Sequence, residues 1–400
     1  MRLDKYSYSY IGLLVFHTVV LLFIANDFSI SYKESLKYFD DSNILYYITY
    51  ISTNIFGNNN FALRLPFVLF YTASSILFYN ITDGYFRHQW DRVIALSIFM
   101  VLPGVNSSAL LVNESIVVIF FTLIYLYSYK VTKQHNYFLL FLFLFVDNSF
   151  AILFLSLFIY SLNKKDNKLL VISLILFGLS MSIYGFDMGG RPRGYFIDTF
   201  GMYATIFSPI LFIYFFYSIY RVGIHFKKDI YWYIAITALM LSFIFSLRQK
   251  IDIADFAPFT VIAVPIMVKL FMHSIRVRLK EFRKVEYSIA VVSIVILVLN
   301  FFVLVFNKQF YRFMDDPSKH FIYKYHTTQE LAMRLKDLGI EKIDTKNKQL
   351  QQKLKYYGIE KGEDLYLSEH FIPNCEKTIT IKYYGKLIKR YYIYRADMRR

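Results

Sequence analysis

The sequence predicts an all-α membrane protein that crosses the bilayer many times and carries a small soluble α/β domain at its C-terminus. Three observations support this class. Of the 400 residues, 56% are hydrophobic and 20% are aromatic, which is more than soluble domains usually carry. Apolar runs long enough to cross about 30 Å of hydrocarbon, roughly 20 residues as a helix, recur through residues 1–306. Residues 307–400 are polar and charged.

The membrane segments are expected to be helices, because hydrocarbon offers backbone N–H and C=O groups no partner outside the chain. The plainest are residues 11–25, 61–80, 111–129, 204–220, 230–247 and 287–306. With weaker runs included, residues 1–306 are expected to hold about 11 membrane segments. Residues 137–162 contain the polar stretch Val146-Asp147-Asn148-Ser149. We expect two short helices that meet at Asp147, since a single span would invert everything downstream.

The net charge of +16 would suit a nucleic-acid partner, but its distribution argues against one. Part of it lies in short loops between the apolar runs, and the rest lies in the tail. With the N-terminus in the cytoplasm, the inner loops carry most of the basic residues found within residues 1–306, as the positive-inside rule requires. These residues are Arg87, Arg92, Lys130, Lys133, Lys164, Lys165, Lys168, Arg221, Lys227, Lys228, Arg276, Arg278, Lys280, Arg283 and Lys284. The C-terminal domain is then expected outside.

Four outer segments follow from this topology: residues 26–60, 104–114, 186–203 and 246–258. The first is the longest, and its apolar side, which includes Ile44, Ile48 and Ile51, suits one or two helices that lie along the membrane surface. In the tail, the patterns predict helices over residues 327–338 and 347–357 and strands over residues 378–383 and 389–394.

Acidic and basic side chains gather in these outer segments and define a candidate site. The acids are Glu34, Asp40, Asp41 and Glu114, and the cations are Arg64, Arg191, Arg193, Arg248 and Lys250. The planar fork of arginine binds phosphate through paired, charge-assisted hydrogen bonds. A neighbouring carboxylate can act as a general base toward a hydroxyl or an amine. The pattern predicts transfer chemistry on a phosphate-bearing lipid.

Each of these residues also has a plainer interpretation. A single acid in a surface loop, such as Asp40 or Asp41, is most often only solvated, and Arg191 and Arg193 could equally be ordinary loop charges. Arg64 differs, because it lies inside the apolar sequence Leu63-Arg64-Leu65-Pro66, where an unpaired charge is costly. A functional role or a buried ion pair is expected for it. The sequence contains no metal-ligand spacing, phosphate-binding loop, nucleophile elbow or dinucleotide fingerprint.

The order of these features resembles the GT-C superfamily of membrane glycosyltransferases. The branch it resembles comprises the protein mannosyltransferases and aminoarabinose transferases, which use polyprenyl-phosphate-linked sugars. Residues 56–66 are similar to that branch's fG…aLRLP segment before the second span. Asn113-Glu114 opens a span where the family often has an acid. Residues 248–265 are similar to the family's late K-x-x-Y-x-L-P-x-x-P segment.

The resemblance implies a mechanism and a location. A polyprenyl-phosphate sugar would dock its phosphate among the five cations named above. Glu34, or Asp40 or Asp41 in its place, would deprotonate or orient the acceptor, with Glu114 as a secondary acid and inversion at the sugar carbon. The family's first loop commonly has Asp-Glu, whereas Lys33 precedes Glu34 here. This leaves the base and any need for a divalent metal ion open. A bacterial inner membrane is implied, with residues 1–306 as the transferase domain and residues 307–400 as a periplasmic domain.

Two other function classes stay open. A transporter or lipid flippase should show internal repeats with broken helices at the membrane midplane, and no such repeat is present in the sequence. A non-catalytic envelope scaffold could act through residues 307–400. The sugar, the acceptor and the oligomeric state are not specified by any motif.

Overall fold

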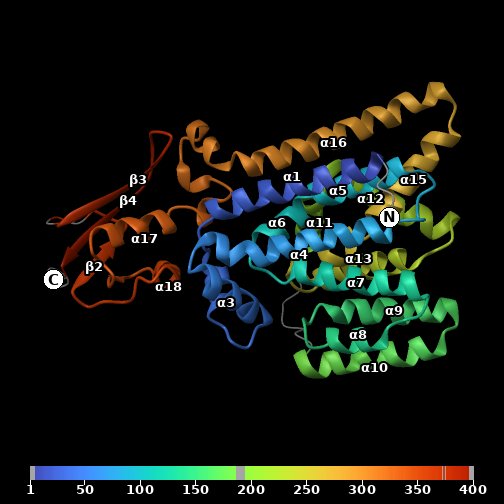
Figure 1. The fold of residues 1–400 in the computed structure, drawn as a ribbon, viewed down its shortest axis with the longest axis horizontal. Coiled ribbons are helices and arrows are strands. Elements are labelled where there is room, and N and C mark those ends of the chain that lie inside the picture. The colour runs from blue at the N-terminus through green and yellow to red at the C-terminus, as the bar shows by residue number, and fades with distance from the viewer. Residues whose placement is uncertain (1–4, 186–193, 372, 374, 396–400) are drawn as a thin grey trace. The chain divides into compact units, whose positions relative to one another are not determined.

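The computed structural model describes residues 5–185, 194–371, 373 and 375–395. Within these residues the chain forms a large set of helices followed by a small sheet (Figure 1). The helices of the apolar part are α1 (Lys5–Asp27), α4 (Asn60–Ile81), α5 (Gln89–Val101), α6 (Pro103–Leu110), α7 (Ser115–Thr132), α8 (Tyr137–Phe143), α9 (Phe150–Lys164), α10 (Asn167–Tyr184), α11 (Phe196–Phe207), α12 (Pro209–His225), α13 (Ile230–Ser246), α14 (Ala257–Val261), α15 (Val264–Val277) and α16 (Arg283–Val305).

The chain is a multi-pass membrane protein, as predicted. In the described residues, six helical stretches are long and apolar enough to cross a membrane, and two bent helix pairs raise the number to eight. Helices α9 and α13 are shorter and apolar. With up to eight candidate spans, these two helices bring the number of apolar segments in the described residues to ten. The apolar runs of the sequence predict roughly 11. The predicted fold class, a helical membrane protein with a small C-terminal sheet, is confirmed.

Two breaks between helices have clear local causes. The predicted break at Asp147 is confirmed: α8 ends before it, and the Asp147 carboxylate accepts a hydrogen bond from the Ser149 N–H at 2.9 Å. The single span predicted over residues 204–220 is wrong, because α11 and α12 meet at an angle of 104°. Pro209 has no N–H to continue a helix and disfavours helical geometry in the residue before it. Ser208 is non-helical, with φ +71° and ψ 149°.

The chain divides into two compact units. The first, which we call the bundle unit, comprises residues 1–18, 67–109 and 113–301. The second, which we call the loop–tail unit, comprises residues 19–66, 110–112 and 302–400. The tail therefore belongs to the same compact unit as the first outer loop. The division of the chain at residue 306 into two domains stays a prediction.

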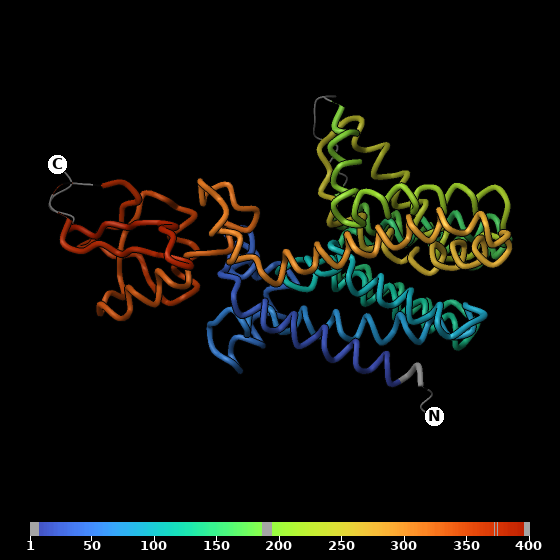
Figure 2. Tube along the Cα trace, turned by 90° about the horizontal axis from the view of Figure 1, so that it is seen from above, coloured from blue at the N-terminus to red at the C-terminus, as the bar shows by residue number. Residues whose placement is uncertain are grey.

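The loop–tail unit contains short elements from the first outer loop and from the tail. Its loop supplies α2 (Tyr32–Tyr38) and α3 (Ile44–Phe56), and its tail supplies α17 (Thr328–Asp337) and α18 (Lys348–Tyr356). The strands are β1 (Asp344–Thr345), β2 (Leu365–Ser368), β3 (Lys377–Tyr383) and β4 (Lys386–Arg395). They form one sheet in the order β1-β2-β4-β3, in which only β1 and β2 pair in parallel. The antiparallel β3–β4 hairpin is visible in the red part of the tube in Figure 2.

Helix α3 exposes its large apolar side chains. Ile51 and Ile55 are 61% and 68% exposed, whereas Thr49 and Ser52 are buried. The small polar residues thus pack inward, and the apolar side is left without protein cover. An exposed apolar side of this kind is what a helix lying along the membrane surface requires.

Candidate functional site

The sequence Leu63-Arg64-Leu65-Pro66 forms the first turns of α4, and the proline creates a need that a neighbour meets. Pro66 lacks the N–H that would bond to the carbonyl of Ala62 four residues earlier. The Ser52 hydroxyl of α3 donates to that carbonyl at 2.6 Å. This bond connects α3 to the first turn of α4, two residues before Arg64.

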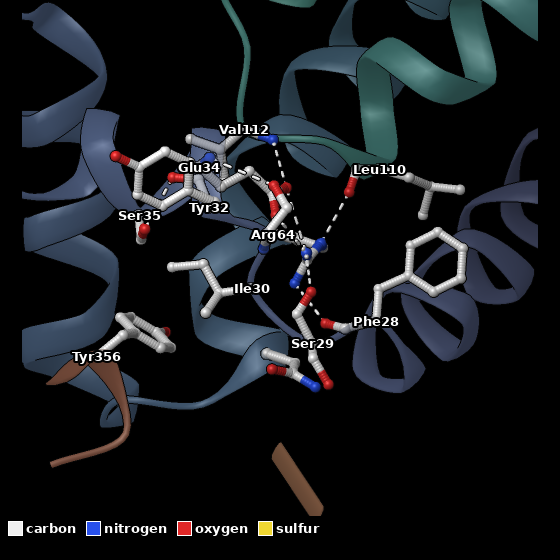
Figure 3. Close-up of polar contacts among 12 residues, drawn as sticks. Phe28, Ser29, Ile30, Tyr32, Glu34, Ser35, Arg64, Leu110, Val112 and Tyr356 are labelled. Carbon is white, nitrogen blue, oxygen red and sulfur yellow. Dashed lines mark hydrogen bonds and ion pairs between the residues drawn. The ribbon is translucent and has the colours of Figure 1, made fainter. Parts of the chain in front are cut away.

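Arg64 is fully buried and forms an ion pair with Glu34, which is 3% exposed. Figure 3 shows the guanidinium directed at Glu34 and at three backbone carbonyls. Its Nη2 lies 3.0 Å from Glu34 Oε2 and also donates to the Ser29 carbonyl. Its Nε donates to the Leu110 carbonyl at 2.8 Å, and Nη1 donates to the Phe28 carbonyl at 2.7 Å. The buried ion pair that was one of the two expectations for Arg64 is therefore present.

Glu34 is as fully engaged as its partner. Its Oε2 accepts from the Ser31 N–H at 2.8 Å, while the Ser31 hydroxyl accepts from the Glu34 N–H, which together form the capping box that starts α2. Its Oε1 accepts from the Val112 N–H at 3.0 Å. We call this set of contacts the Glu34–Arg64 latch. It fixes the end of α1, the start of α2 and residues 110–112 to one point.

Two tyrosines of the tail, Tyr356 and Tyr357, form hydrogen bonds with residues that neighbour the latch. The Tyr357 hydroxyl accepts from the Ile30 N–H at 3.0 Å and donates to Asn60 Oδ1 at 2.5 Å. Burial raises the pKa of Tyr357 to about 12, so the hydroxyl remains a donor at neutral pH. The Tyr356 hydroxyl donates to the Asn59 carbonyl at 2.9 Å. The end of α18 and the residue that follows it are therefore bonded to the segment before Glu34 and to the segment before Arg64.

A buried histidine cluster supports the latch through Phe28, whose ring lies against His326. His326 Nδ1 is 2.8 Å from the Tyr311 hydroxyl, and His320 stacks on the Tyr311 ring at 4.1 Å between centroids. Burial lowers the pKa of His326 to about 3, and the positive charge of Lys308 acts in the same direction. The imidazole of His326 is therefore neutral in the folded protein at physiological pH.

The other acids of the first loop are differently placed. Asp40 and Asp41 are exposed in the turn between α2 and α3. The Asp40 carboxylate accepts from the N–H and the hydroxyl of Ser42, at 3.2 Å and 2.6 Å. This contact stabilises the turn and leaves the carboxylate open to solvent.

The bundle unit contains a pocket beside the last outer loop. Its volume is about 580 Å³. Arg248, Lys250, Asp252 and Asp255 line one part of it, and Asn148 and Ser149 belong to the break between α8 and α9. Apolar side chains of α9, α10 and α13 line the rest, namely Ile152, Leu155, Phe177, Leu241, Ile244 and Phe245. The pocket thus joins a charged part to an apolar wall.

The same loop lies against the start of α7. The Ser115 hydroxyl donates to the Ala254 carbonyl at 3.0 Å, and Asp252 caps the short turn that follows it through the Ala254 N–H at 3.0 Å. Glu114 stands at the N-cap of α7 and is half-buried. Within the bundle unit, the structure therefore brings Glu114 to the loop that carries Arg248 and Lys250.

Two expected phosphate ligands, Arg191 and Arg193, lie outside the described residues. In the part of the chain that the structure describes, no group of three or more His, Cys, Asp or Glu side chains is arranged to hold a metal ion.

Sequence reasoning missed two features of the site. Asp252 and Asp255 lie within residues 248–265, and their spacing next to two cations is a signal that could have identified them. The partners of Arg64 could not be found in that way, because three of them are backbone carbonyls brought together by folding.

Comparison with known proteins agrees with this architecture. Residues 40–146 match the family Dolichyl-phosphate-mannose-protein mannosyltransferase. A crystal structure of ArnT from Cupriavidus metallidurans bound to undecaprenyl phosphate has a similar fold, with a TM-score of 0.56 and 11% identity over 97% of this chain and 98% of that chain. The resemblance to GT-C membrane glycosyltransferases is confirmed. The family match over residues 40–146 includes Asp40, Asp41, Arg64 and Glu114. A comparison with curated proteins gave no match.

Proposed function

We propose that this chain is a membrane glycosyltransferase that moves a sugar from a polyprenyl-phosphate-linked donor to an acceptor of the cell envelope. The observation that carries the proposal is the 580 Å³ pocket of the bundle unit, in a chain with an ArnT-like fold. A polyprenyl phosphate has a dianionic or monoanionic head and a long apolar tail. The pocket offers Arg248 and Lys250 to the head and the apolar wall of α9, α10 and α13 to the first isoprene units.

The chemistry follows from this placement. The bond between the anomeric carbon and the phosphate oxygen breaks as the acceptor oxygen or nitrogen bonds to that carbon, with inversion. The electron pair remains on the lipid phosphate, where Arg248 and Lys250 stabilise the developing charge. The acceptor proton passes to a carboxylate. Within the bundle unit we propose Glu114 and Asp255 as the candidates, because both are half-buried. Asp40 and Asp41 of the first loop, which are exposed, stay the bases that the resemblance implied.

We propose positioning roles for Glu34 and Arg64, in place of the catalytic and phosphate-binding roles that the resemblance implied. Both carboxylate oxygens of Glu34 accept hydrogen bonds within the protein, and the Arg64 guanidinium is buried among backbone carbonyls. A base must reach the acceptor and a phosphate ligand must reach the donor, and the latch occupies both groups. For orientation, we propose a cytoplasmic N-terminus and a periplasmic loop–tail unit, which the charge distribution supports.

Binding of undecaprenyl phosphate tests the pocket. Purified protein in detergent is titrated with undecaprenyl phosphate, and the bound fraction is measured by native mass spectrometry. Because hydrogen bonds to charged groups contribute about 1.5–3 kcal/mol each, R248Q/K250Q should weaken binding by at least about tenfold. The control K280Q/K284Q removes the same charge from two exposed lysines at the start of α16 and just before it and should bind as the wild type does. Equal affinity of all three proteins would contradict the assignment.

A further inference from the structure

A second polar pocket lies at the other end of the bundle unit's helices. Helix α9 contributes Ile152 to the pocket described above and Lys164 to this one. These two residues are about 18 Å apart along the helix axis. The second pocket has a volume of about 560 Å³ and is formed where α7 ends, α8 begins and α9 turns into α10. It plays no part in the sugar transfer proposed above.

Three lysines surround this pocket. Lys133 follows the end of α7, Lys164 ends α9, and Lys168 lies in the first turn of α10. All three are exposed, and within the described residues none of them forms an ion pair. The one carboxylate in the lining, Asp166, caps α10 by accepting from the Leu169 N–H at 3.1 Å. The pocket therefore carries an excess of positive charge.

Aromatic side chains give the pocket fixed walls. The hydroxyls of Tyr129 and Tyr160 lie 3.2 Å apart, and the ring of His135 stacks on Tyr129 at 4.5 Å between centroids. The Lys168 ammonium lies 4.9 Å from the centre of the Tyr137 ring. Lysines that serve only to orient a membrane protein need no such walls, because the positive-inside rule depends on charge and not on a cavity.

The position of the pocket at the ends of membrane-spanning helices indicates which kind of anion it binds. Two candidate spans terminate at it, since α7 ends at Thr132 and α10 begins at Asn167. Exposed apolar side chains lie beside the lysines in the chain: Val131 is 63% exposed, Phe138 69% and Leu162 53%. The pocket thus lies where headgroups meet acyl chains, and the neighbouring apolar side chains can contact those chains.

We propose that this pocket binds the phosphate headgroup of an anionic membrane lipid between Lys133, Lys164 and Lys168. Basic pockets between membrane helices are suited to such headgroups. On the predicted topology the lipid belongs to the cytoplasmic leaflet, opposite the proposed donor site. The tyrosine hydroxyls line the same pocket and can hydrogen-bond to the glycerol or phosphate oxygens.

Native mass spectrometry of the full chain in detergent tests this proposal. The protein is titrated separately with dioleoyl-phosphatidylglycerol, dioleoyl-phosphatidylcholine and inorganic phosphate. We expect phosphatidylglycerol to be retained in preference to phosphatidylcholine. Because each lysine near the surface contributes about fivefold to the affinity, K133Q/K164Q/K168Q should bind it at least about tenfold more weakly. The matched control K227Q/K280Q/K284Q removes three exposed lysines elsewhere and should retain it.

Two results would contradict the proposed lipid site. Equal loss in the control variant would mean that general charge attracts the lipid, and the proposal would fail. Binding of inorganic phosphate as tight as that of phosphatidylglycerol would contradict the proposal and reassign the pocket to a soluble anion. If the triple variant does not remain folded, the single variants K164Q and K168Q are compared with K280Q in the same titration. R248Q/K250Q should retain phosphatidylglycerol as the wild type does, which separates this pocket from the proposed donor site.

Discussion

Replacing Arg64 by alanine should unfold the loop–tail unit more readily than any change at the exposed acids of the same loop. The substitution leaves the buried Glu34 carboxylate without its counter-ion and three buried carbonyls, those of Phe28, Ser29 and Leu110, without their donor. Breaking a buried ion pair by removing one partner costs about 3–5 kcal/mol. At about 2–4 °C per kcal/mol, the unfolding midpoint in detergent should fall by roughly 6–20 °C.

The assay compares R64A with E34Q, D40N and the double variant E34Q/R64A. Limited proteolysis of the tail during a thermal ramp reports on the loop–tail unit. D40N, at an exposed turn, should shift the midpoint by less than about 0.5 kcal/mol. The double variant should be less destabilised than the sum of the two single changes, because the buried charge that R64A leaves unpaired is then absent. If R64A and D40N unfold at the same temperature, the latch does not support the fold as we describe.

Three further predictions concern the same unit. Y357F removes two buried hydrogen bonds and should lower the free energy of unfolding of the loop–tail unit by about 1–3 kcal/mol, measured by the same proteolysis assay. The stability of the bundle unit should change less. S52A leaves the Ala62 carbonyl without a donor and should cost about 1–3 kcal/mol, whereas S52T should restore much of it. Because the folded-state pKa of His326 lies below its unfolded value, the unfolded chain binds the proton first. Stability should therefore fall by about 2 kcal/mol between pH 7 and pH 5, and H326Q should show a flatter midpoint-versus-pH curve.

The parts of the fold that follow from local pattern could be predicted from the sequence. Apolar runs predicted the membrane helices, and the polar stretch around Asp147 predicted a break where α8 and α9 meet. The tail helices and the β3–β4 hairpin also follow from their periodicity. The bend at Ser208 was missed, although Pro209 gave a local signal for it, because the apolar run continues through the proline.

The candidate site was predicted less completely, for a physical reason. The cost of a lone charge in an apolar run predicted that Arg64 would have a partner, but nothing in the sequence links it to Glu34 rather than to an anionic ligand. That choice depends on tertiary contacts, including those of Tyr357 from the tail. The change in composition after residue 306 predicts a separate domain over residues 307–400. Composition cannot reveal that α18 packs on the first loop.

A mass-spectrometric comparison of envelope molecules tests the proposed sugar transfer in the cell. Glycolipids, glycans and proteins are analysed from cells that lack the chain and from cells that carry the wild type, R248Q/K250Q or K280Q/K284Q. We predict that one class of envelope molecule loses the mass of a single glycosyl group in the cells without the chain. The wild type and K280Q/K284Q should restore that mass, and R248Q/K250Q should not. An unchanged set of envelope masses, together with movement of undecaprenyl phosphate across the bilayer of vesicles that contain the purified protein, would rule out sugar transfer and favour a flippase.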